Sequence, residues 1–60
     1  EQYRTWSTMV SLDPKGKGIH YARLAEALDC TSGAANQRIV RIMKMGYAEK
    51  VRPGIYRAIT

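Results

Sequence analysis

The sequence is poor in residues that could cross-link a small fold or hold a metal in it. It has one cysteine, Cys30, and one histidine, His20. The chain therefore cannot form an internal disulfide or assemble a four-ligand Cys/His zinc site from its own residues. Sixty residues make at most one domain, spanning 1–60, and without such staples its core must be apolar. We interpret Cys30 as a small hydrophobe tucked under a turn.

Long apolar runs are also missing. No run approaches the roughly 20 residues that a bilayer requires, and charges recur along the whole chain. We therefore predict neither a signal peptide nor a membrane span, and expect the protein in the cytoplasm, associated with the nucleoid, or in the nucleus. The chain opens at Glu1 without an initiator methionine. This indicates either processing or a domain taken from a longer protein, and both alternatives stay open.

The usual arrangements of catalytic residues are absent from the sequence. It has no paired carboxylates, no nucleophile with a base, and no glycine-rich phosphate loop, because Lys15-Gly16-Lys17-Gly18 is too short and wrongly placed for one. His20 could cap a helix, touch phosphate or do neither, and without a partner it carries no catalytic inference. We predict that the chain is not an enzyme and uses no cofactor or metal.

Acidic residues are scarce in the second half of the chain. Residues 1–30 carry four basic and four acidic side chains, which sum to zero, whereas residues 31–60 carry six basic side chains against Glu49 alone, which sum to +5. A basic excess confined to one part of a small domain is typical of proteins that bind polyanions, since neutralising phosphates releases counterions. The alternative is an ordinary solvated basic face.

Apolar spacing predicts three helices and a hairpin. A helix over 2–12 ends at Asp13-Pro14, Ile19 forms a stub strand, and a second helix runs from about residue 20 or 21 to Asp29. A third helix follows and ends at Gly46, before two β-rich runs, 47–51 and 55–59, joined by Arg52-Pro53-Gly54. The fold class is α+β. We expect these aromatic residues to face the core: Tyr3, Trp6, Tyr21 and Tyr47. The order of apolar and polar residues along the two hairpin strands fits either choice of inner face, so the sequence does not tell which residues of each strand face the core.

The second and third helices resemble a helix-turn-helix pair, and the third carries the candidate site. Thr31-Ser32 supplies a hydroxyl N-cap, and a helical wheel centred on Ala35, Ile39 and Ile42 points an acid-free face outward. Amides and arginine can read base edges in the major groove of double-stranded DNA, while Lys44 meets phosphate. The candidate DNA-binding residues of this helix are Thr31, Ser32, Gly33, Ala34, Asn36, Gln37, Val40, Arg41 and Lys44.

The stretch from Leu24-Ala25-Glu26-Ala27-Leu28 through Ala35, Ile39 and Ile42 to Gly46-Tyr47 resembles the reader region of winged helix-turn-helix repressors. It is most similar to the isocitrate-lyase-regulator (IclR) type and more loosely to the multiple-antibiotic-resistance (MarR) type. Pro53-Gly54-Ile55-Tyr56-Arg57 is similar to the wing of that family. The resemblance implies wing contacts to DNA from Lys50, Arg52 and Arg57, with Arg52 at the tip the strongest candidate. The sequence departs from the family at Asp29, Gln37 and Arg38.

Two other functions stay open. The outward face could dock an acidic partner, as in winged helices that serve as adaptors in larger assemblies. Winged helices that bind left-handed duplex have an asparagine ten residues before the helix-ending glycine, as Asn36 and Gly46 are spaced, although Val40 and Tyr56 replace their tyrosine and tryptophan. For right-handed DNA, a single copy reads one half-site, so a homodimer on a palindromic site is a further possibility.

Overall fold

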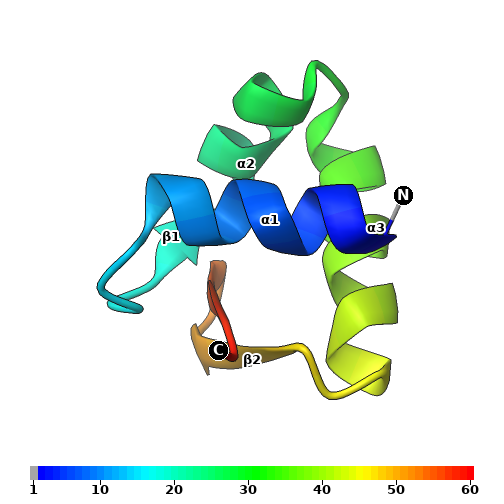
Figure 1. The fold of residues 1–60 in the computed structure, drawn as a ribbon. Coiled ribbons are helices and arrows are strands. Elements are labelled where there is room, and N and C mark those ends of the chain that lie inside the picture. Colours follow the sequence, from blue (N-terminus) through cyan, green and yellow to red (C-terminus); the bar gives the residue numbers. More distant parts are fainter. Residues whose placement is uncertain (1) are drawn as a thin grey trace.

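Three helices and a small sheet make up the computed structural model, which describes residues 2–60 (Figure 1). The elements follow the order α1 (Gln2–Leu12), β1 (Ile19–His20), α2 (Tyr21–Leu28), α3 (Ser32–Lys44), β2 (Ala48–Arg52) and β3 (Ile55–Ala58). Helix α1 crosses in front of α3, and the three-stranded antiparallel sheet, ordered β1-β3-β2, lies below it. The predicted α+β class and each predicted element are confirmed.

The loop after α1 is held by one carboxylate. Asp13 Oδ1 accepts from the Lys17 amide at 2.9 Å and Oδ2 from the Gly18 amide at 2.7 Å. Gly18 has φ +117°, and a Cβ there would lie 2.6 Å from Cγ2 of Ile55. A side chain at position 18 would therefore be strained by the backbone conformation and would force the Ile55 side chain to shift.

Side chains cap both α2 and α3. His20 Nδ1 accepts from the Ala22 amide at 3.1 Å at the start of α2, and Thr31 Oγ1 accepts from the Ala34 amide at 3.1 Å at the start of α3. The Thr31 cap is as predicted, and capping was one of the roles considered for His20. Between them Asp29, with φ 56°, adopts the left-handed conformation that ends α2.

The end of α3 was also predicted correctly. Gly46 has φ +85°, and the Tyr47 amide donates to the Ile42 carbonyl at 2.9 Å. This left-handed residue turns the chain from the helix into β2.

The core lies between the helices and the inner face of the sheet. It is formed by Met9, Ile19, Leu24, Leu28, Ile39, Ile42, Ala48 and Tyr56. Trp6, Tyr21 and Cys30 are partly buried against this cluster, as expected. Thr5 is fully buried, which the sequence pattern did not predict.

Two aromatic residues contradict the predicted core. Tyr3 is 75% exposed and Tyr47 is 50% exposed. Helix α1 turns Thr5 and Met9 inward, and at about 100° per residue Tyr3 lies some 200° from Thr5 and points away. Tyr47 precedes buried Ala48, so strand alternation turns its side chain outward. The prediction that Tyr3 and Tyr47 face inward was therefore wrong.

The pairing register and the burial of Tyr56 show which residues of the hairpin face the core. Ala48 pairs with Ala58, Glu49 with Arg57 and Lys50 with Tyr56, and an irregularity between Lys50 and Arg52 then brings Arg52 opposite Ile55. Tyr56 is buried and Arg57 is exposed, so Tyr56 marks the inner face of the sheet.

Over residues 2–60, none of the helices has the length and apolar character to cross a bilayer.

Candidate nucleic-acid interface

The outward face of α3 is the one that the helical wheel predicted. Ala35, Ile39 and Ile42 are fully buried. On the opposite side Gly33, Gln37, Val40, Arg41 and Lys44 are all exposed, and Ala34 and Asn36 are half-buried at the flanks. The core contacts of three apolar residues therefore set the rotation of the helix about its axis, and with it the direction in which its amide and cationic side chains point.

At the start of α3, one polar side chain caps the helix and the next one is exposed to solvent. Thr31 Oγ1 accepts the Ala34 amide, so this oxygen is engaged in the cap, whereas the hydroxyl hydrogen can still donate. Ser32 is exposed beside it. Both lie where a recognition helix comes nearest to the bases.

The central strand of the sheet, β3, contacts α3 through a side-chain hydrogen bond. The Tyr56 hydroxyl donates to Asn36 Oδ1 at 3.3 Å. With its oxygen turned toward the wing, Asn36 has its amide nitrogen to offer as a donor. Sequence reasoning missed this role of Tyr56, because the alternation of β3 did not reveal which of its residues faces inward.

Lys50 lies on the same side of the sheet as this contact. Residues directly opposite in an antiparallel pair share a face, and Lys50 is opposite Tyr56. The exposed Lys50 side chain therefore belongs to the sheet face that is turned toward α3.

Arg52 is separated from Lys50 by the strand irregularity. Because Arg52 is opposite Ile55, it follows the other face of the hairpin and extends from the end of β2 at the wing tip. It is exposed there, next to Pro53-Gly54. The register thus places Lys50 on the sheet face turned toward the helices and Arg52 on the other face, at the end of β2.

Arg57 is held away from α3. Its Nε and Nη2 donate to Glu49 Oε2 at 3.0 and 2.7 Å, and its Nη1 donates to the Gly16 carbonyl at 3.5 Å. Both partners of the ion pair remain nearly half exposed on the outer face of the hairpin. Arg57, one of the three predicted wing residues, is therefore paired with Glu49 and lies, like Arg52, on the sheet face turned away from α3.

The hairpin turn at Pro53-Gly54 is hydrogen-bonded to the start of α2. The Tyr21 amide donates to the Gly54 carbonyl at 3.2 Å, and the His20 ring stacks on that of Tyr21 with centroids 4.5 Å apart. A Cβ at Gly54 would lie 3.3 Å from His20 Nε2. These contacts fix the hairpin turn relative to α2, and no periodic pattern in the sequence indicated them.

All charged side chains of α3 are basic. Helix α3 contains no acidic residue, and Arg41 and Lys44 occupy its last turn, where cations also complement the helix dipole. Arg38 is half-buried and has a partner of its own. Within residues 2–60 no three side chains of His, Cys, Asp or Glu gather into a possible metal site.

Compared with known proteins, the chain matches no family model, no curated protein and no solved structure.

Proposed function

We propose that this chain is a winged helix domain that binds double-stranded DNA in a sequence-specific manner, in the control of transcription or replication. The observation that carries the proposal is the face of α3, where Gln37, Arg41 and Lys44 are exposed together without an acidic neighbour on the helix. An α-helix with its side chains is about 10–12 Å wide, which fits the roughly 12 Å major groove of B-DNA.

Each side chain on this face has a matching chemical group in the groove. Gln37 can pair with an adenine edge through both its amide atoms, and Arg41 can donate to O6 and N7 of guanine. Val40 can pack on a thymine methyl, and Gly33 with Ala34 lets the backbone come close. Lys44 reaches phosphate, which positions the helix without reading sequence.

The wing adds backbone contacts in this proposal. Lys50, on the sheet face turned toward α3, meets phosphate beside the major groove, and Arg52 reaches phosphate or the minor groove from the tip. Arg57 contributes little, because Glu49 already neutralises it. The domain has no enzymatic role here, and its place of action is wherever duplex DNA is found, in the cytoplasm or the nucleus.

Fluorescence anisotropy with a labelled duplex tests the proposal. We expect Gln37→Ala and Arg41→Ala each to weaken binding to a selected site by about 1–3 kcal/mol. Lys15→Ala is the matched control, since Lys15 is an exposed cation in the loop after α1, and it should leave affinity nearly unchanged. If the wild-type chain bound no duplex, or if Lys15→Ala weakened binding as much as Arg41→Ala, the proposal would fail.

The same measurement addresses the adaptor function. An adaptor would tolerate Arg41→Ala without loss of duplex affinity because its partner is a protein. Circular dichroism of an alternating CG duplex tests the left-handed alternative, for which exposed Val40 offers no aromatic ring at the tyrosine position.

A further inference from the structure

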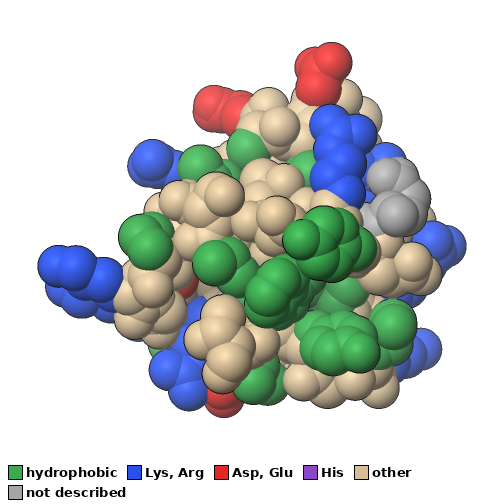
Figure 2. All heavy atoms as spheres, in the orientation of Figure 1, with side chains coloured by type: hydrophobic (Ala, Val, Ile, Leu, Met, Phe, Trp, Pro, Cys, Tyr) green, Lys and Arg blue, Asp and Glu red, His purple; other side chains and the backbone are tan. Residues whose placement is uncertain are grey.

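A cluster of exposed and half-buried apolar side chains lies outside the proposed DNA-binding site. We call it the aromatic patch, and it consists of Tyr3, Trp6, Met45 and Tyr47. Figure 2 shows hydrophobic side chains gathered on the face that carries α1, with most Lys and Arg side chains toward the edges. Tyr3 is 75%, Met45 53% and Tyr47 50% exposed. The largest apolar patch on a small protein is often a contact site.

The patch is built from two distant segments that are tied together through the backbone of Ile59. The Trp6 indole nitrogen donates to the Ile59 carbonyl at 3.1 Å, and the Ile59 amide donates to the Tyr47 carbonyl at 2.8 Å. The Tyr3 and Trp6 rings lie 6.1 Å apart. The chain therefore holds these side chains in a defined arrangement.

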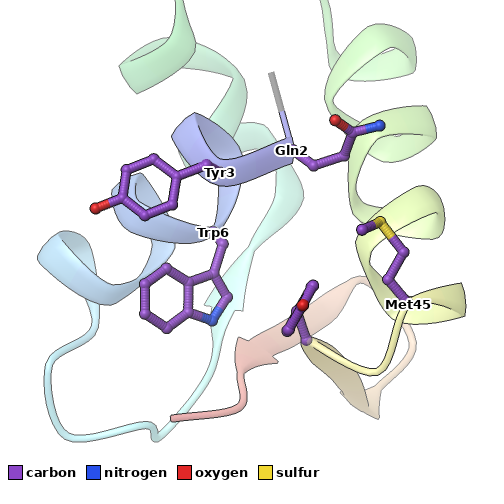
Figure 3. Close-up of a pocket in the computed structure, with 5 residues that line it drawn as sticks. Gln2, Tyr3, Trp6 and Met45 are labelled. Atoms are coloured by element: carbon purple, nitrogen blue, oxygen red, sulfur yellow. The ribbon is translucent and has the colours of Figure 1, made fainter.

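The patch surrounds an open hollow of about 340 Å³, lined by Gln2 and by the patch residues Tyr3, Trp6, Met45 and Tyr47. Figure 3 shows Tyr3 and Trp6 extending from one side of α1, and Met45 standing across from them near the end of α3. Within residues 2–60, every side chain that lines the hollow is uncharged. Its surface is therefore suited to an apolar partner.

We propose that the aromatic patch is the surface through which two copies of this chain associate about a two-fold axis. The protein carries a net charge of +5, so two copies repel each other wherever their basic faces meet. An acidic partner would be drawn to those basic faces instead. The uncharged patch is a surface on which a second, equally basic copy can pack without opposing cations.

The shape of the patch suits a self-complementary contact. In a two-fold arrangement the same surface serves both partners, so a group that protrudes from one copy must find a recess in the other. Tyr3 is the most exposed member and borders the hollow, which allows the Tyr3 ring of each copy to enter the recess beside Trp6 and Met45 of the other. Methionine adapts readily to such a contact.

The size of the patch predicts weak association. An aromatic side chain buries about 150–250 Å², so the exposed parts of the four patch residues, with Gln2, which also lines the hollow, offer on the order of 500 Å² per copy. Two copies would then bury about 1,000 Å², near the lower limit for a specific interface. The free protein is therefore a monomer when dilute and pairs when concentrated.

Sedimentation over a concentration series, without DNA, tests this inference independently of the proposed function. We expect the average mass to rise toward that of a dimer, and the emission of Trp6, the single tryptophan, to shift to shorter wavelength in parallel. Tyr3→Glu places a charge in the patch and should weaken association at least about tenfold. Glutamate in the first turn of α1 also favours the helix, so the fold is retained.

Val51→Glu is the matched control, because Val51 is 41% exposed and lies on the hairpin, outside the patch. It adds the same charge and should leave association unchanged. Circular dichroism of both variants establishes that they are folded. A monomer at every concentration, or equal association by wild type and Tyr3→Glu, would overturn the inference whatever the outcome of the duplex measurements.

Discussion

Tyr56 links the folding of this protein to its proposed site. Its ring belongs to the core and is only 9% exposed, while its hydroxyl donates to Asn36 on α3. In the proposed complex, Tyr56 acts on DNA binding without touching the duplex. It holds the oxygen of Asn36 toward the hairpin, which leaves the Asn36 amide nitrogen to donate to an acceptor on a base or a phosphate.

Tyr56→Phe removes this hydroxyl and keeps the ring. We expect stability to fall by about 0.5–1.5 kcal/mol, the usual value of one hydrogen bond, and base discrimination to decrease at the position that Asn36 contacts. Competition between the selected site and its single-base variants measures the change. Asn36→Ala should affect the same position, and the double variant should lose no more than Asn36→Ala alone. Unchanged discrimination in Tyr56→Phe would contradict the positioning role.

At the scale of elements, helix α3 depends on its first turn. Because the first amides of a helix have no partner within it, the Thr31 hydroxyl at 3.1 Å from the Ala34 nitrogen satisfies a group that water would otherwise have to solvate. The same turn lies where the proposed site approaches the bases. In the proposed complex, the residue that caps α3 therefore also lies close to the bases.

Thr31→Ala should lower the free energy of unfolding by about 1 kcal/mol through loss of the cap. Urea denaturation measures this loss. Thr31→Ser retains a capping oxygen and should recover most of it. Ser32→Ala is the neighbouring control, since Ser32 is exposed and makes no cap, and its effect should stay within about 0.5 kcal/mol. An equal loss in Ser32→Ala would indicate that the cap of Thr31 is unimportant.

For the whole molecule, the distribution of charge decides how many cations the proposed DNA complex can use. Arg41 and Lys44 lie on the outward face of α3, Lys50 lies on the sheet face turned toward the helices, Arg52 ends β2, and Arg57 is paired with Glu49. In the proposed complex, three or four of these cations replace the counterions of the duplex. The net charge of +5 alone would not have distinguished these cations from those elsewhere.

The salt dependence of duplex binding should reflect this number. With a slope of about 0.9 per phosphate contact, the logarithm of the binding constant should fall by about 3 to 4 for each tenfold increase in salt. Lys50→Ala should reduce the slope by about one, and Arg57→Ala should leave it unchanged. Anisotropy titrations over a salt series give these values. A slope near zero would exclude binding through phosphates.

Local sequence signals were sufficient for the elements and their ends. Asp13-Pro14, the Thr31 cap and Gly46 act through bonds within a few residues, so their effects can be read along the chain. The outward face of α3 was also predictable, because Ala35, Ile39 and Ile42 mark its inner side at helical spacing. The resemblance to winged helix repressors stays a hypothesis, since the agreement of three helices and a sheet with it is coarse.

By itself, then, the sequence determined which segments coil, which extend and which side of α3 faces water, since each depends on neighbours in the chain. Only the tertiary structure decided that Tyr3 and Tyr47 lie outside, that Arg57 pairs with Glu49, and that Tyr56 reaches Asn36. The reason is physical. A strand of alternating residues, or a helix with apolar groups on two sides, has no inner face until another element packs against it, and that contact joins residues far apart in the sequence.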